Sequence, residues 1–170
     1  DVTLRGEQDL DLFGALAFTA YGSAGVEVPT TPGDVGRIAA ELQAEGRSPV
    51  MLCAPPLMHG TALFLAIGAF VMGGSVVLLG GRSFDAAELW DLAQRHRVTQ
   101  ISLVGDAFAR PLNDALDAAE RDGVLPDLTS VTRIVSTGAT LSAEQKRAFQ
   151  RRLPNAVMLD MIGASEGGPF

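Results

Sequence analysis

Short apolar runs alternate with longer segments of helical periodicity over most of this chain. Runs rich in Val, Ile and Leu and bounded by turn residues predict buried strands, and they cover Val50–Cys53, Ser75–Leu79, Thr99–Val104, Val131–Ser136 and Ala156–Asp160. The segments between them predict helices at Gly60–Met72, Asp85–His96, Asp106–Arg121 and Ser142–Arg152. Strands that alternate with helices indicate βαβ units. The pattern therefore predicts an α/β fold with a mainly parallel, five-stranded sheet and flanking helices.

Residue types suited to helix termini stand where the predicted helices begin and end. Asp34 can cap a helix that Gly46 ends. Pro111 predicts a turn or kink within its helix, because proline lacks the backbone N–H. Two further helix starts have capping-box spacing: Asp85 with Glu88, and Ser142 with Gln145.

The region before the first strand has a different character. Leu10–Tyr21 is apolar with helical spacing, and residues 22–32 are rich in Gly, Pro and Thr. We therefore expect a single α/β unit over residues 1–170, with a helical lead-in and loop at 1–48 and βα repeats at 49–170. A chain of 170 residues with 47% hydrophobic residues is long enough for one sizeable core.

Composition and charge exclude several classes of function. The net charge of −7 comes without a basic stripe, so nucleic-acid binding has no electrostatic basis. Cys53 is the only cysteine, which excludes an internal disulfide and a thiolate metal cluster, and its apolar surroundings predict burial. Residues 1–11 are acidic and polar rather than a signal peptide, so we expect a cytoplasmic protein. Glycines interrupt the longest apolar stretch, Thr61–Leu79, so βα packing explains it better than a membrane span.

Polar and glycine-rich loops follow three of the predicted strands. Right-handed crossovers place the carboxyl ends of parallel strands at one edge of the sheet, where ligands bind. His59 follows the first strand, between a rigid Pro-Pro segment and a helix start. It can hold a carboxylate there or merely cap the helix, and the two alternatives are evenly balanced. The small side chains of Ser136–Ser142 let the backbone approach a flat ligand. The alternative is an ordinary βα turn in which Ser142 caps the next helix.

The third loop follows the last predicted strand and carries a hydroxyl beside a carboxylate. Ser165 and Glu166 lie between glycines in Gly163–Gly168. A glutamate is a hard oxygen ligand suited to Mg²⁺, and a serine hydroxyl can donate to a phosphate; the alternative is a solvated loop carboxylate. Ser165 lacks the glycine flanks of a hydrolase nucleophile elbow, so hydrolase chemistry is not predicted.

These three segments, in this order, resemble the adenylate-forming superfamily, and in particular the bacterial fatty-acyl-CoA synthetases. The opening residues 4–10 are also similar to the segment that follows the phosphate loop in those enzymes. The resemblance implies that the chain is an internal fragment of the large amino-terminal domain, with Rossmann-like layering. It also implies that the phosphate loop precedes residue 1 and that the small carboxyl-terminal domain with the catalytic lysine follows residue 170. The fragment alone is therefore expected to be inactive and to be able to self-associate through exposed apolar edges.

The resemblance implies a role for each site residue. His59 and Gly60 would border the acyl substrate, and Ser165 and Glu166 would be catalytic, with Glu166 as the Mg²⁺ ligand. The nucleotide would contact Gly138, Ala139, Thr140, Asp160, Met161, Ile162, Gly163 and Ser165. Ile162 stands where the family usually has an aromatic residue that stacks on adenine. The implied substrates are a carboxylic acid, ATP and coenzyme A, with Mg²⁺ as the metal.

Two alternatives remain at this point. A non-catalytic nucleotide-binding or interaction module with a doubly wound fold also fits, because the chain has no phosphate loop. A dinucleotide-dependent oxidoreductase would need a glycine fingerprint after the first strand, where Pro55-Pro56 stands instead. The sequence fixes neither the acyl chain length nor the choice between coenzyme A and a carrier-protein thiol.

Overall fold

A parallel sheet forms the centre of the computed structural model, which describes residues 21, 26–161, 163–164 and 168–169. The five strands have the order β2-β1-β3-β4-β5, and every neighbouring pair is parallel. The strands are β1 (Val50–Cys53), β2 (Ser75–Leu78), β3 (Gln100–Leu103), β4 (Arg133–Thr137) and β5 (Val157–Met161). The short strands β6 (Gly163–Ala164) and β7 (Gly168–Pro169) form a separate antiparallel pair. The predicted α/β fold with a five-stranded parallel sheet is confirmed.

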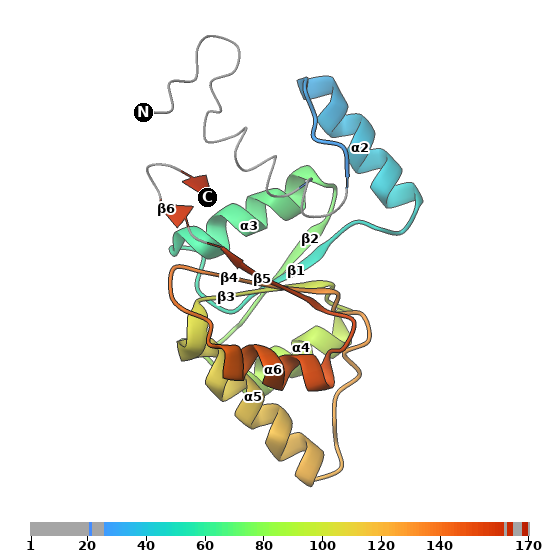
Figure 1. Cartoon of the computed structure of the whole chain (residues 1–170). Helices are drawn as coiled ribbons and strands as arrows, with labels where there is room; N and C mark the ends of the chain where they lie inside the picture. The colour runs from blue at the N-terminus through green and yellow to red at the C-terminus, as the bar shows by residue number, and fades with distance from the viewer. Residues whose placement is uncertain (1–20, 22–25, 162, 165–167, 170) are drawn as a thin grey trace.

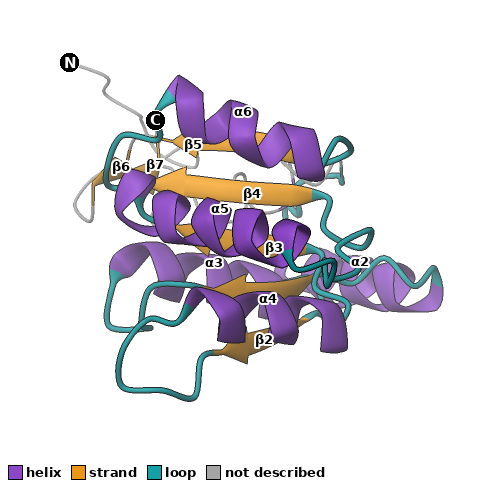
Figure 2. Ribbon diagram, turned by 90° about the horizontal axis from the view of Figure 1, so that it is seen from below, coloured by secondary structure: helices purple, strands orange, loops and turns teal. Residues whose placement is uncertain are grey.

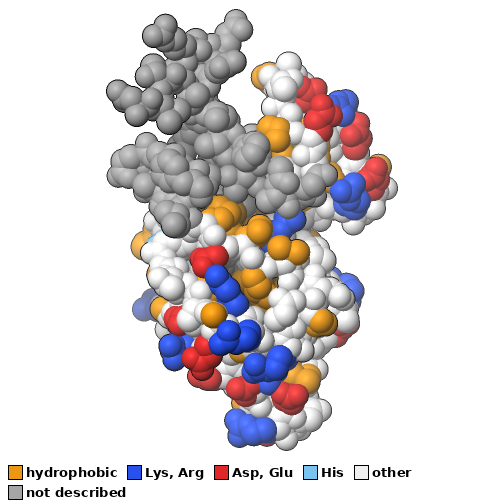
Figure 3. Space-filling view, viewed as in Figure 1, with side chains coloured by type: hydrophobic (Ala, Val, Ile, Leu, Met, Phe, Trp, Pro, Cys, Tyr) orange, Lys and Arg blue, Asp and Glu red, His pale blue; other side chains and the backbone are white. Residues whose placement is uncertain are grey.

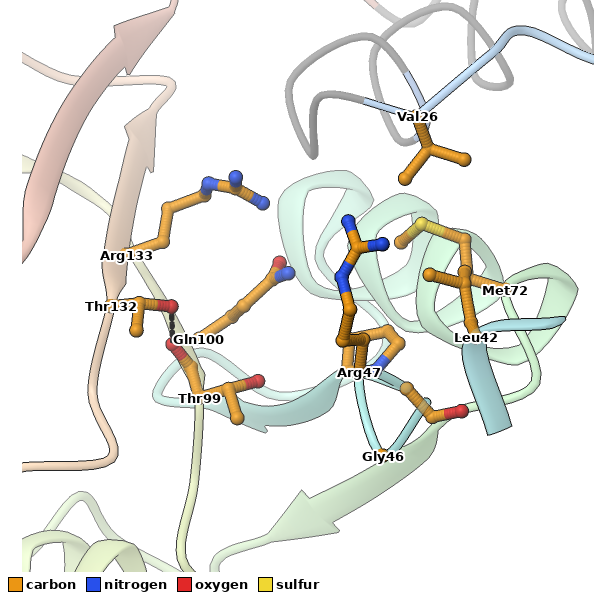
Figure 4. A pocket seen from close by; sticks show the side chains of 11 residues that line it. Val26, Leu42, Gly46, Arg47, Met72, Thr99, Gln100, Thr132 and Arg133 are labelled. Carbon is orange, nitrogen blue, oxygen red and sulfur yellow. Dashed lines mark hydrogen bonds between the residues drawn. The ribbon is translucent and has the colours of Figure 1, made fainter. Parts of the chain in front are cut away.

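Helices cover both faces of the sheet (Figures 1 and 2). One face carries α3 (Gly60–Val71), with α2 (Pro32–Ala44) beyond it. The other face carries α4 (Ala86–Arg95), α5 (Gly105–Arg121) and α6 (Ala143–Arg152). The apolar stretch Thr61–Leu79 thus divides between α3 and β2, as βα packing predicts. Within the described residues, no helix has the length and apolar character needed to cross a membrane.

The alternation of side chains along each strand divides the core between the two faces. Leu52 of β1 and Ile101 of β3 are fully buried beneath α4–α6, where Trp90 packs edge-on against Phe149 with 6.4 Å between ring centroids. The Trp90 Nε1–H donates to the carbonyl oxygen of Leu112 at 2.9 Å, so this large side chain is buried without an unpaired donor. On the opposite face Met51 and Cys53 pack against the small residues of α3, namely Ala62, Ala66 and Ala69.

The predicted start of α2 is wrong by one turn. Thr31, not Asp34, is the N-cap, and the helix begins at Pro32. Proline at the first helical position loses no hydrogen bond, since that N–H has no partner within the helix. Asp34 is instead the third helical residue, and its carboxylate accepts from the Thr31 N–H at 2.9 Å. Hydrogen bonds from Thr31 lower the pKa of Asp34 to about 2, so it stays ionised at this positive helix end.

Other helix termini agree with the sequence in part. Asp85 and Ser142 are N-caps as predicted, and each accepts from a backbone N–H of its helix. The side chain three residues after each N-cap does not complete the capping box and binds another donor instead. Glu88 accepts from the Gly80 N–H, and Gln145 accepts from the Asn113 side-chain amide. The helix α5 continues through Pro111 rather than ending in a turn. The predicted helix at Leu10–Tyr21 lies outside the described residues except for Tyr21.

A methyl group at Gly74 is expected to destabilise the fold strongly. A Cβ at this position would overlap the carbonyl oxygen of Pro49 and lie 2.7 and 2.9 Å from two carbons of the proline ring. That carbonyl oxygen accepts from the Ser75 N–H at 2.9 Å, at the point where β1 and β2 begin. We expect Gly74→Ala to lower the free energy of unfolding by about 3 kcal/mol, the upper part of the usual range for overpacking, as measured by urea denaturation.

Gly36→Ala is the matched control for this substitution. Gly36 lies inside α2, is exposed, and has no atom within 4 Å of a built Cβ. Alanine there should raise the free energy of unfolding by roughly 0.5–1 kcal/mol, because glycine loses more backbone entropy in a helix. Equal effects of the two substitutions would contradict the close approach of Gly74 to Pro49.

Candidate functional site

The strand order places a topological switch point at the carboxyl edge of the sheet, between β1 and β3, and we refer to this position as the crevice. The chain leaves β1 toward α3 on one face and leaves β3 toward α5 on the other. Ligands of open α/β sheets bind where neighbouring connections diverge in this way. Two of the predicted site segments lie here. The His59 segment follows β1 and borders this crevice, and the Gly138 segment follows β4, one strand away from it.

His59 is the N-cap of α3 and is exposed at the crevice. Its backbone N–H donates to the carbonyl oxygen of Pro56 at 2.9 Å, which ties it to the rigid proline segment. Its Nδ1 accepts from the Thr61 N–H at 3.2 Å. The neutral ring consequently carries its proton on Nε2, which is the nitrogen that can donate to a ligand. The capping alternative is confirmed, since His59 caps α3 through Nδ1. A carboxylate-binding role for Nε2 stays a prediction from the sequence.

The loop that follows β4 meets His59 over the end of β3. Gly138 has φ +86°, a left-handed conformation that glycine adopts without strain. A Cβ on Gly138 would lie 3.6 Å from His59 Cε1 and 3.6 Å from Val104 Cγ1. Segments about eighty residues apart in the chain thus come into contact through right-handed crossovers, as the sequence pattern predicts. Gly138, Ala139 and Thr140 are exposed and lie open to a ligand at this edge; we refer to residues 138–140 as the small-residue loop.

The start of α5 holds the small-residue loop from beneath. The Gly105 N–H donates to Ser136 Oγ at 3.1 Å, and the Asp106 N–H donates to the carbonyl oxygen of Thr140 at 3.0 Å. The sequence pattern places Gly105 and Asp106 at the carboxyl edge of the sheet but assigns Asp106 no role in the site. Its one local signal is the position of a glycine and an aspartate directly after a buried strand.

The end of β5 lies beside the end of β4. Asp160 is in register with Ser136, and Met161 with Thr137. The Asp160 carboxylate accepts from Lys146 Nζ of α6 at 2.7 Å, on the face that carries α4–α6. Met161, the next residue along the strand, points to the opposite face. Asp160 and Met161, both among the residues that the resemblance assigns to the nucleotide, thus present their side chains to different sides of the sheet.

Part of the predicted site lies outside the described residues. Ile162, Ser165 and Glu166 belong to this part, so their roles remain predictions from the sequence. The backbone of Gly163 pairs with Pro169 in the β6–β7 hairpin. Among the described residues, no group of three or more His, Cys, Asp and Glu side chains is placed to hold a metal ion. The Mg²⁺ ligand that the family resemblance implies, Glu166, stays a prediction.

Cys53 takes no part in the site. It is 2% exposed, and its Sγ lies 3.8 Å from the carbonyl oxygen of Ala62. Burial raises the pKa of the thiol, so it remains protonated and unreactive at neutral pH. The prediction of a buried, small hydrophobic residue is confirmed.

Comparison with known proteins decides the family. The family model described as AMP-binding enzyme matches residues 29–170. This chain belongs to that family. The sequence resemblance to adenylate-forming enzymes is thereby confirmed, and the crevice of this AMP-binding chain holds two of the three segments that carried it.

Named relatives of this AMP-binding chain include two bacterial ligases. A medium/long-chain-fatty-acid–CoA/3-oxocholest-4-en-26-oate–CoA ligase of Mycolicibacterium smegmatis is 40% identical over 114 residues, which cover 67% of this chain and 20% of the relative. A 3-oxocholest-4-en-26-oate–CoA ligase of Rhodococcus rhodochrous is 33% identical, with 74% of this chain and 22% of the relative covered. The chain spans about a fifth of the length of these relatives.

Solved structures share the fold of this chain. The luciferase-like enzyme of the mealworm Zophobas morio matches with a TM-score of 0.59 at 18% identity, over 78% of this chain and 31% of the other. At this level of identity the match concerns the fold alone. It agrees with the five-stranded parallel sheet and flanking helices described above.

Proposed function

We propose that this chain is part of an ATP-dependent, AMP-forming acyl-CoA ligase that activates a carboxylic acid of the fatty-acid class. The observation that carries the proposal is the contact between the His59 segment and the small-residue loop at the crevice between β1 and β3. These are the segments that the family resemblance assigns to the acid and to the nucleotide. The printed names of the bacterial relatives, both CoA ligases, support the same reaction class.

The proposed reaction has two steps. The carboxylate of the acid attacks the α-phosphate of ATP, which forms an acyl-adenylate and releases pyrophosphate. The thiol of coenzyme A then attacks the acyl carbonyl, which forms the thioester and releases AMP. Bringing two anions together is the physical difficulty, and bound Mg²⁺ offsets phosphate charge in such reactions.

The residues of this chain would bind and orient the two substrates. The Nε2–H of His59 is available to a carboxylate at the start of α3, where the helix dipole also favours negative charge. The exposed small-residue loop can accept the flat face or edge of a base next to it, because its own side chains are small. Because His59 and the small-residue loop are in contact, they would hold the carboxylate of the acid and the α-phosphate of ATP in a near-attack geometry.

The helix α3 is the proposed wall of the acyl pocket. Ala62 and Ala66 pack on β1 and belong to the core, so they are not available to a ligand. Leu63 is 42% exposed and Phe64 is half-buried one turn from His59. We propose that these two apolar side chains, together with Gly60, contact the acyl chain.

A coupled assay tests the proposal. The full-length enzyme, given ATP, Mg²⁺, a long-chain fatty acid and coenzyme A, is expected to release AMP and pyrophosphate and to form the acyl-CoA thioester, detected by mass spectrometry. Residues 1–170 alone are expected to release no pyrophosphate, since the family's phosphate loop and catalytic lysine are not in this sequence. Thioester formation without AMP release, or the absence of both products with a range of carboxylic acids, would refute the proposal.

A further inference from the structure

Asp106 contacts both sides of the turn that carries the small-residue loop. Its backbone N–H donates to the carbonyl oxygen of Thr140 at 3.0 Å. Its Oδ1 accepts from the Ser142 N–H at 2.8 Å. Asp106 therefore fixes the end of the loop through its backbone N–H. Through its side chain it also fixes Ser142, the N-cap residue of α6.

Gly105 brings the backbone of α5 into direct contact with the same loop. A Cβ on Gly105 would lie 2.6 Å from the carbonyl oxygen of Thr140 and 2.8 Å from Ala139 Cβ, so no side chain fits between them. Its φ of +56° is also a conformation that favours glycine. The N–H of Gly105 holds Ser136 Oγ at 3.1 Å, at the entrance to the loop. The loop is thus held at its start, middle and end by two consecutive residues.

The Asp106 carboxylate is charged in this position. Its side chain is 24% exposed and lies 3.3 Å from Arg110 Nη2, one turn further along α5. The hydrogen bond from the Ser142 N–H, and then the charge of Arg110, lower the pKa of Asp106. A hydrogen bond between an ionised acceptor and a backbone donor is stronger than a neutral one, so the loop is firmly held at neutral pH.

We propose that Asp106 is a positioning residue for the nucleotide, which keeps the small-residue loop in the conformation that faces ATP. This inference rests on the proposed function, since that proposal assigns the loop to the nucleotide. Without the Asp106 side chain, the loop would occupy the binding conformation only part of the time. The apparent affinity for ATP falls by that fraction, whereas chemistry after binding is unchanged.

Kinetics of the full-length enzyme test the proposal. Asp106→Ala is expected to raise the KM for ATP about tenfold, with kcat and the KM for coenzyme A changed less than about twofold, which corresponds to the loss of one charged hydrogen bond. Asp106→Asn keeps an oxygen that accepts from the Ser142 N–H, so it should recover most of the affinity for ATP. Titration with a fluorescent ATP analogue should give the same order of binding.

Asp127→Ala is the matched control. Asp127 also accepts from a backbone N–H, that of Thr129 at 3.0 Å, and also lies near an arginine, Arg97, at 3.4 Å. It precedes β4 and so lies at the opposite edge of the sheet from the small-residue loop. Its replacement should leave the KM for ATP unchanged.

The outcomes separate this inference from the proposed function. An active wild type whose KM for ATP is the same in Asp106→Ala would overturn the inference alone. Equal changes in Asp106→Ala and Asp127→Ala, or a fall in kcat with an unchanged KM for ATP, would also overturn it, because they indicate general destabilisation or a different role. A wild type that neither binds the ATP analogue nor forms acyl-CoA would overturn the proposed function and this inference with it.

Discussion

Glu166→Ala in the full-length enzyme is expected to lower the rate of acyl-adenylate formation about a thousandfold. A carboxylate is the ligand type that Mg²⁺ prefers, and Glu166 is the residue of this chain that the family resemblance assigns to the metal. A metal that neutralises phosphate charge contributes several kcal/mol to the transition state, which is the basis for the expected magnitude. Pyrophosphate release in the presence of fatty acid and ATP measures this step without coenzyme A.

The dependence on Mg²⁺ distinguishes a metal ligand from a structural carboxylate. If Glu166 binds the metal, raising the Mg²⁺ concentration should partly restore the activity of Glu166→Gln, which keeps one neutral oxygen ligand. Glu144→Ala is the control, because Glu144 is an exposed carboxylate in the first turn of α6. Unchanged adenylate formation in Glu166→Ala would remove this residue from the proposed metal site.

Gly138→Val is expected to lower kcat/KM for ATP about a hundredfold. A residue with a side chain in the left-handed conformation of Gly138 costs roughly 1–2 kcal/mol. The Cβ alone would already touch His59 Cε1 and Val104 Cγ1 at 3.6 Å, so the two methyl groups of valine would push the small-residue loop and His59 apart. Steady-state kinetics with varied ATP and fatty acid should show losses for both substrates, because their proposed sites meet at this contact.

Gly123→Val is the matched control for the backbone strain. Gly123 has φ +71°, close to that of Gly138, but no atom lies within 4 Å of a Cβ built there. It follows α5 at the far edge of the sheet. The substitution should reduce stability by a similar amount and leave kcat/KM for ATP unchanged. Equal kinetic losses in both variants would show that strain, rather than the contact with His59, matters.

The sequence pattern was sufficient to predict the five parallel strands and the helices between them, because each depends on local periodicity, whereas β6 and β7 lie in a segment predicted as a loop. The predicted strand Val50–Cys53 has the same bounds in the structure, and the other four strands differ by one or two residues at their ends. The order of the strands was not predicted, since it depends on pairing between distant segments. The predicted start of α2 was wrong because Thr31 and Asp34 are both residue types that cap helices. Pro32 favours Thr31 as the N-cap, since proline is preferred at the first helical position.

The segments that form the candidate site could be predicted from the sequence, but the hydrogen bonds and ion pairs that hold them in place could not. His59 and Gly138 follow strand ends, so the rule that parallel strands end at one edge brings them together. The hydrogen bond between Asp106 and Ser142 joins residues 36 positions apart and involves a backbone donor, which no side-chain pattern records. For the same reason the ion pair between Asp160 and Lys146 could not be predicted from either segment.

The connection from β3 to α5 is a single residue, Val104, whereas seven residues join β2 to α4. The short connection lies under the contact between His59 and the small-residue loop, and the long one lies at the sheet's outer strand with most of its residues exposed. An insertion after β3 would fill the crevice, while one between Leu79 and Asp85 would extend into solvent. Evolution can therefore vary the length of this chain at the outer strand and has little freedom to do so at the centre of the edge.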